Sequence, residues 1–146
     1  MNSYRPGDIV EIGTDKGLVY VHLTHEHPSY PPVVRLLKGV HAAQPDDIAG
    51  HARDNVFYTA MIPLVSALNR IGVSHRKVGE LALTGSDRDF PTFRMPIRDK
   101  QGNVVYWWFW DGRGLTYSSE LEAQQDSLPL REVMSASTMM EILLAS

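Results

Sequence analysis

Residues 104–110 read Val-Val-Tyr-Trp-Trp-Phe-Trp, and this stretch decides the fold class because a run of β-branched and aromatic residues between two turns predicts a strand. The turns are residues 99–103, which contain Gly102, and residues 111–114, which read Asp-Gly-Arg-Gly. The stretch also holds all 3 tryptophans of the chain. It is therefore expected to anchor a β-sheet.

Further strands are predicted on both sides of this stretch. Residues 9–12 and 18–24 form an antiparallel pair, joined by the turn residues 13–17. Prolines at positions 91 and 96 indicate that the strand at residues 92–97 lies at a sheet edge or contains a bulge. The remaining predicted strands are residues 33–37, 56–59 and 115–117, and residues 128–130 are expected to be extended.

Two main helices are predicted from the spacing of apolar residues. The first covers residues 61–71 and ends at Gly72, and the second begins near Ser135. A short helix over residues 119–125 and a loop with one helical turn over residues 40–55 are also expected. The predicted fold is α+β: an antiparallel, strongly bent and partly barrel-like sheet with two main helices packed on it, in a single domain over residues 1–146.

The composition excludes several classes of site. The chain has 146 residues and no cysteine, so it has no thiol nucleophile, iron–sulfur cluster, cysteine-ligated zinc or disulfide. It carries 14 basic and 17 acidic side chains, a net charge of -3. Its richest basic stretch, residues 70–77, has acidic flanks, and a phosphate-binding surface needs a concentration of positive charge. A nucleic-acid partner is therefore not expected.

No apolar run approaches the roughly 20 residues that a membrane span needs. The sequence therefore predicts a cytoplasmic protein without a membrane partner. It also predicts no catalytic residues, because the serine in Gly85-Ser86-Asp87 lacks the second glycine of a nucleophile elbow and no phosphate-binding glycine motif occurs.

The aromatic strand is the strongest candidate for a binding surface. Tyr106, Trp108 and Trp110 are expected on one face of it, and Trp107 and Phe109 on the other. Two interpretations stay open: both faces are covered as core, or one face is exposed to a partner, since tryptophan and tyrosine dominate interface hot spots. The sequence does not decide which face is exposed.

Arg94 is the fourth candidate residue for partner binding. It is expected on a strand face beside aromatic neighbours. There it either anchors the fold through a cation–π contact or ion pair, or presents its guanidinium to a ligand.

The histidines at positions 22, 25 and 27 suggest an alternative function. On a continued strand, His25 and His27 would share a face and chelate a first-row metal. A third ligand would have to come from one of four residues further along, His41, Asp46, Asp47 or His51. The alternative is therefore a metal-dependent enzyme or metal binder, although we assign no metal ligand or cofactor from the sequence.

Six segments of the chain form an ordered set that spans about residues 5–142. They are Arg5-Pro6-Gly7-Asp8-Ile9-Val10-Glu11-Ile12, Lys16-Gly17-Leu18-Val19-Tyr20, Thr24-His25-Glu26-His27-Pro28, Pro91-Thr92-Phe93-Arg94, Trp107-Trp108-Phe109-Trp110-Asp111-Gly112 and Leu128-Pro129-Leu130-Arg131-Glu132. This set resembles a group of largely uncharacterised bacterial proteins. That group is similar to immunity proteins of polymorphic toxin systems, which bind and block a cognate toxin.

The resemblance implies a small, non-catalytic binding protein whose partner is a toxin. Together with the aromatic strand, it makes a protein-binding module the first hypothesis for function. Metal binding through His25 and His27 is the second, and a small ligand in the mouth of a bent sheet is the third.

Overall fold

The computed structural model describes residues 3–118, 128–130 and 132–146, without the side chains of residues 86 and 87. The chain forms two compact units: the first comprises Met1–Leu83 and Val133–Ser146, and the second comprises Thr84–Glu132. The single domain expected from the sequence stays a prediction, because the division into compact units does not say whether they unfold together.

A five-stranded antiparallel sheet forms the first unit, in the order β4-β3-β2-β1-β5. Three helices accompany it. The elements are β1 (Asp8–Thr14), β2 (Gly17–His25), β3 (Val33–Leu37), α1 (Ile48–Asp54), β4 (Val56–Met61), α2 (Leu64–Ile71), β5 (Ser74–Glu80) and α3 (Ala136–Leu144).

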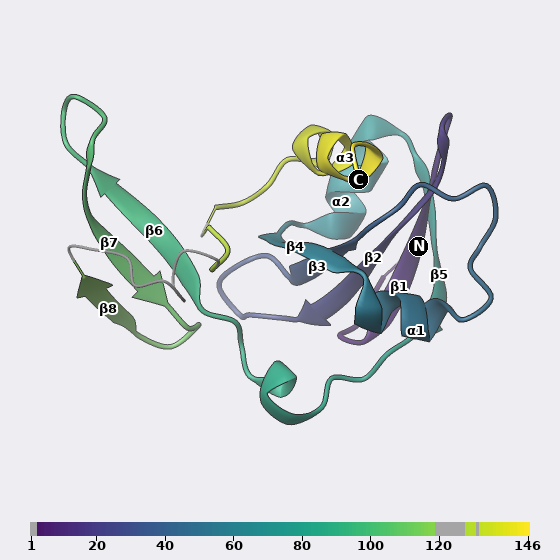
Figure 1. Ribbon diagram of the computed structural model, residues 1–146, viewed down its shortest axis with the longest axis horizontal. Coiled ribbons are helices and arrows are strands. Elements are labelled where there is room, and N and C mark those ends of the chain that lie inside the picture. Colours follow the sequence, from purple (N-terminus) through teal and green to yellow (C-terminus); the bar gives the residue numbers. More distant parts are fainter. Residues whose placement is uncertain (1–2, 119–127, 131) are drawn as a thin grey trace. The chain divides into compact units, whose positions relative to one another are not determined.

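Both faces of this sheet are buried. Successive side chains of a strand point to opposite faces, and in the central strands both sets of side chains are largely apolar. On one face, Val10, Val21 and Leu36 belong to a core that includes Leu68 of α2 and Met139 of α3. On the other face, a smaller core of four buried residues faces α1. It consists of Ile9, Tyr20, Leu37 and Ala52. Figure 1 shows α2 and α3 on one side of the sheet and α1 on the other.

The helix ends follow local chemistry. Gly72 stops α2 with φ of 75°, and Ser135 caps α3 by accepting from the Thr138 amide at 3.2 Å. The apolar periodicity extended α2 three residues too far toward its N-terminus, because Met61 is the last residue of β4 and Pro63 precedes the first helical turn.

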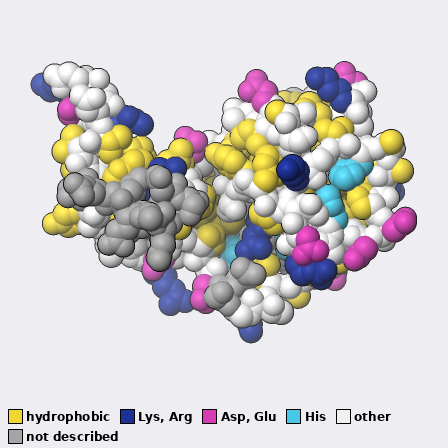
Figure 2. All heavy atoms as spheres, viewed as in Figure 1, with side chains coloured by type: hydrophobic (Ala, Val, Ile, Leu, Met, Phe, Trp, Pro, Cys, Tyr) yellow, Lys and Arg dark blue, Asp and Glu magenta, His cyan; other side chains and the backbone are white. Residues whose placement is uncertain are grey.

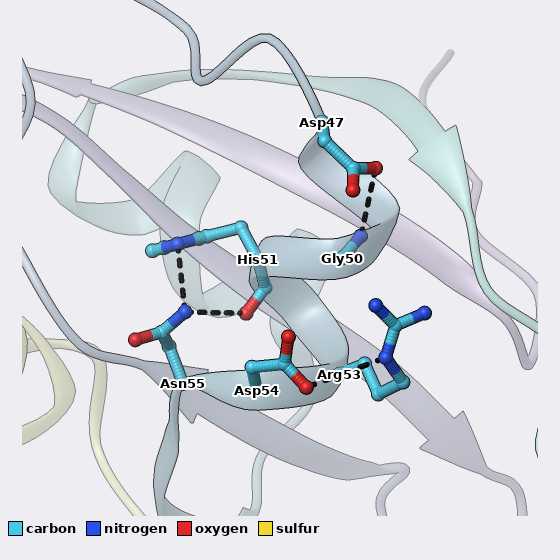
Figure 3. Close-up of polar contacts among 6 residues, drawn as sticks. All are labelled: Asp47, Gly50, His51, Arg53, Asp54 and Asn55. Carbon is cyan, nitrogen blue, oxygen red and sulfur yellow. Dashed lines mark hydrogen bonds and ion pairs between the residues drawn. The ribbon is translucent and has the colours of Figure 1, made fainter.

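The helical turn expected within residues 40–55 is the helix α1, so the described residues form three α-helices: the two main ones, α2 and α3, and this shorter one. Figure 3 shows how it is closed at both ends: Asp47 Oδ1 accepts from the Gly50 amide at 3.0 Å, and the Asn55 side-chain amide donates to the His51 carbonyl at 3.1 Å. These contacts satisfy backbone groups that a helix of this length leaves without partners.

The five-stranded sheet has two edges, so the barrel-like closure expected from the sequence is not confirmed. The edge strand β5 carries charged side chains, with Lys77 bonded to Asp8 at 3.1 Å. The other edge strand, β4, carries no charged side chain. The C-terminal segment covers its end, where Met134 donates its amide to the Met61 carbonyl at 2.9 Å and Val133 bridges to Met61.

The second unit is a separate three-stranded antiparallel sheet in the order β6-β7-β8. Its elements are η1 (Gly85–Arg88), β6 (Phe93–Arg98), β7 (Val104–Trp110) and β8 (Leu115–Ser118). In the part of the chain that the structure describes, the strands form two sheets instead of the one expected, because strand signals do not say which strands pair. The helix expected over residues 119–125 lies outside the described residues.

Among the described residues, no helix combines the length and the apolar character needed to span a membrane.

Candidate functional site

Two turns fix the register of the three-stranded sheet. Between β6 and β7, Asp99 Oδ1 accepts from the Gln101 amide at 2.9 Å and the Asn103 amide at 3.0 Å. Between β7 and β8, Asp111 Oδ1 accepts from the Arg113 and Gly114 amides, both at 2.9 Å. These amides hold the pKa of Asp111 below its usual range, so the carboxylate stays charged and the turn stays closed at neutral pH.

Gly112 lets the second turn pack tightly. Its φ is 90°, and a Cβ at this position would lie 2.7 Å from the Phe90 ring. The turn therefore requires glycine both for its backbone conformation and for space. As a result, Trp110 pairs with Leu115, and Trp108 pairs with Tyr117.

This register creates an aromatic cleft, which we define by its lining residues Val105, Tyr106, Trp108 and Tyr117. The cleft has a volume of about 370 Å³. Its three rings contact one another: the centroid of Tyr106 lies 6.3 Å from that of Trp108 and 6.2 Å from that of Tyr117, and the last two are 5.5 Å apart. Tyr117 is 71% exposed, whereas Tyr106 and Trp108 are half-buried.

The rings of the aromatic cleft are tilted against one another by 52° to 69°. The two contacts of Tyr106 are edge-to-face and that of Trp108 with Tyr117 is tilted, which are favourable arrangements for aromatic pairs. The cleft therefore offers aromatic area at its mouth, and Figure 2 shows hydrophobic side chains at the surface over this sheet.

Arg94 lies on the opposite face of the same sheet. Its guanidinium carbon is 5.0 Å from the centroid of the Trp107 ring, and its Nε donates to the Leu128 carbonyl at 2.7 Å. The Arg94 amide also donates to the Pro129 carbonyl at 2.8 Å. These contacts tie residues 128–130 to β6, as expected for an anchor of the fold rather than a residue of the aromatic cleft.

Trp110 is part of the core of the second unit. It is 6% exposed, and its ring packs against Phe90 and Phe93 at centroid distances of 5.3 and 6.0 Å. Of the four candidate residues from the sequence, the structure thus brings Tyr106 and Trp108 together in the cleft and places Trp110 and Arg94 elsewhere.

Tyr117 and Val105 line the cleft but were not among the four residues predicted for the site. Tyr117 belongs to a predicted strand, but its position opposite Trp108 depends on the register set by the turn at residues 111–114. Side-chain alternation, counted from Trp108 through the tight turn at residues 111–114 into the next strand, could have placed Tyr117 on the same face as Trp108.

The histidines proposed as metal ligands have other roles. His25 ends β2 and its Nδ1 lies 2.8 Å from the Thr24 hydroxyl, while the Nδ1 of His27 accepts from the Ser29 amide at 3.0 Å. Asp47 caps α1 instead of pointing to them. Within residues 3–118, 128–130 and 132–146, no three His, Asp or Glu side chains are placed to hold a metal ion.

Polar groups are also buried under α1. The Tyr20 hydroxyl donates to Glu11 at 2.9 Å, and Arg76 Nε donates to the same carboxylate at 3.1 Å. Burial, followed by the contact with Glu11, raises the pKa of Tyr20. The rings of His41 and His51 stand perpendicular to each other at a centroid distance of 4.9 Å. Polar contacts therefore lie beside the smaller apolar core on the α1 side, with Glu11 buried and the Arg76 side chain 70% exposed.

His22 makes stability depend on pH. It is fully buried, its Nε2 donates to the Leu81 carbonyl at 2.9 Å, and burial lowers its pKa, with Arg35 and His25 lowering it further. The pKa values of His51 and His75 are lowered by burial as well. Below pH ~6.5 the unfolded chain therefore binds more protons at these histidines than the folded chain does. The stabilities of the two states differ most above that pH, and the free energy of unfolding decreases as the pH drops below it.

We expect the urea midpoint, followed by circular dichroism, to change little between pH 7.5 and about 6.5 and to decrease from there to pH 5.5. The variant His22→Gln keeps an amide donor for the Leu81 carbonyl but does not titrate, so its midpoint should change less over the same range. A wild-type midpoint that stays constant, or an equal slope in the variant, would contradict this assignment.

No family model, curated protein or solved structure matches this chain.

Proposed function

We propose that this protein is a non-catalytic binding protein that contacts a partner protein through the aromatic cleft of its three-stranded sheet. The observation that carries the proposal is the ring cluster of the half-buried Tyr106 and Trp108 and the exposed Tyr117 on one sheet. Trp and Tyr side chains contribute large contact areas at interfaces and are enriched among the residues that dominate binding energy.

Three exposed valine and leucine side chains of β7 and β8 add apolar surface here, and one of them, Val105, lines the cleft itself. Val104, Val105 and Leu115 are 36%, 52% and 51% exposed. Contiguous apolar surface of this kind marks interaction sites in folded proteins. The four lining side chains carry no charged group, so they offer contact and hydrogen-bond donors rather than acid–base chemistry.

The partner that we propose is a bacterial toxin, which the protein would bind and block in the cytoplasm as an immunity protein. The sequence segments that resemble immunity-like proteins support this proposal, and they include Trp107 to Gly112, the strand and turn that build the cleft. Blocking by occlusion needs no catalytic residue, only a surface that fits the toxin.

Co-expression with each neighbouring open reading frame tests this function. We expect one of these products to arrest growth when expressed alone, and growth to return when the present chain is co-expressed and a complex is purified. If no neighbouring product is toxic and none forms a complex, the proposed function is wrong.

The aromatic cleft is tested by Trp108→Ala and Tyr117→Ala in the same complex. Loss of a hot-spot ring costs at least about 2 kcal/mol, so we expect binding to weaken ~30-fold or more in titration calorimetry. The matched control is Phe57→Ala, which removes an aromatic side chain that is 38% exposed on β4. Equal losses in the control, or unchanged affinity in both cleft variants, would place the interface elsewhere.

A further inference from the structure

The two half-buried indoles of the three-stranded sheet, Trp107 and Trp108, have different surroundings. Trp107 and Trp108 are successive residues of β7 and so lie on opposite faces. On one face, the Arg94 guanidinium lies 5.0 Å from the Trp107 ring. On the other face, the described residues supply no cation to the rings of Tyr106, Trp108 and Tyr117.

The three rings of the aromatic cleft lie close together. Their centroids form a triangle with sides of 6.3, 6.2 and 5.5 Å. A group centred above such a triangle lies within about 6 Å of all three centroids, which is the range in which a cation is attracted to an aromatic ring. A single cationic group at the mouth of the cleft can therefore lie within reach of all three rings, and it is attracted by each ring whose face it meets.

The composition of this unit does not oppose a cation. Residues 84–132 carry six basic and eight acidic side chains, a net charge of -2. Val105, Tyr106, Trp108 and Tyr117 themselves bring no positive charge that would repel a cation.

We propose that the aromatic cleft receives an arginine or lysine side chain of the partner protein, bound by cation–π attraction to Tyr106, Trp108 and Tyr117. The proposal rests on the proposed function, because it names the chemical group that the same cleft recognises. The contact of Arg94 with Trp107 shows the same chemistry within this sheet.

The full chain, labelled with ¹⁵N at its tryptophan indoles, tests the proposal by NMR. The probes are two acetylated peptide amides, Gly-Arg-Gly and Gly-citrulline-Gly, since citrulline has nearly the shape of arginine without its charge. We expect the arginine peptide to shift the Trp108 indole signal saturably and to bind about threefold to thirtyfold more tightly than the citrulline peptide. The signal is assigned with Trp108→Phe.

Two variants make the result specific to the cleft. In Tyr117→Leu, the exposed ring is lost and the preference for arginine should disappear, whereas Phe57→Leu, on β4 of the other unit, should keep it. Circular dichroism checks that both variants are folded. Equal binding of the two peptides, or no shift up to tens of millimolar, overturns the proposal of a cation site.

The test separates this proposal from the proposed function. If a neighbouring toxin forms a complex that depends on Trp108 while the peptides bind equally, protein binding stands and cation recognition is wrong. If the arginine peptide is preferred but no toxin is bound, cation recognition stands and the immunity function is wrong.

Discussion

Phe93→Ala is expected to remove about 3–5 kcal/mol from the unfolding free energy of the second unit, enough to unfold a small sheet at room temperature. Phe93 is 0% exposed, and its ring lies 6.1 Å from that of Phe90 and 6.0 Å from that of Trp110. Truncation leaves a cavity between these two rings, and β6 loses the side chain that joins it to β7.

Tryptophan fluorescence measures this effect directly, because all 3 tryptophans of the chain lie on β7 of that unit. We expect the fluorescence of Phe93→Ala to resemble that of the unfolded chain, while the helical signal at 222 nm changes little. The control, Leu115→Ala, truncates a residue that is 51% exposed on β8 and should shift the fluorescence transition only slightly. An equal loss in both signals for Phe93→Ala would instead show one cooperative domain.

Leu68→Ala is expected to have the reciprocal effect and to cost the first unit about 2–5 kcal/mol. Leu68 lies on α2, is 0% exposed, and shares a core with Met139 and Leu143 of α3. Its loss removes part of the contact that holds both helices against the five-stranded sheet.

Circular dichroism at 222 nm reports this change, because α1, α2 and α3 all belong to the first unit. The matched control on the same helix is Ile71→Ala, whose side chain is 38% exposed, and it should cost less than about 1 kcal/mol. The interpretation is wrong if Leu68→Ala leaves the denaturation midpoint of the helices unchanged.

The strongest local signals predicted their elements well. The aromatic stretch is the strand β7 with the predicted bounds, Val104–Trp110, and Ser135 caps α3 as its position suggested. Turn chemistry and aromatic density act over a few residues, so they are readable from the sequence alone.

The strand β5, Ser74–Glu80, was missed because it has none of these signals. Its side chains are mostly exposed, and it includes His75, Arg76 and Lys77. It is a strand because it pairs with β1, a partner more than 60 residues away in sequence. Such a strand is held by its neighbour's hydrogen bonds rather than by its own apolar pattern.

The dependence on strand pairing also explains which residues of the aromatic cleft were predicted and which were not. Tyr106 and Trp108 were expected on one face of a strand, and alternation was sufficient for that expectation. Tyr117 joins them through cross-strand register, and Trp110 is buried because Phe90 and Phe93 pack on it. Both facts depend on which strands pair, and composition and spacing carry no information on pairing.

The two edge strands of the five-stranded sheet differ in how well they are protected against pairing with a strand of another molecule. The charged edge strand β5 resists addition of a further strand, whereas β4 is uncharged and depends at its end on the bond from Met134 to Met61. If residues 133–146 detach, both the end of β4 and the core face under α3 become accessible together. Aggregation of the partly unfolded chain should therefore begin by strand addition at β4.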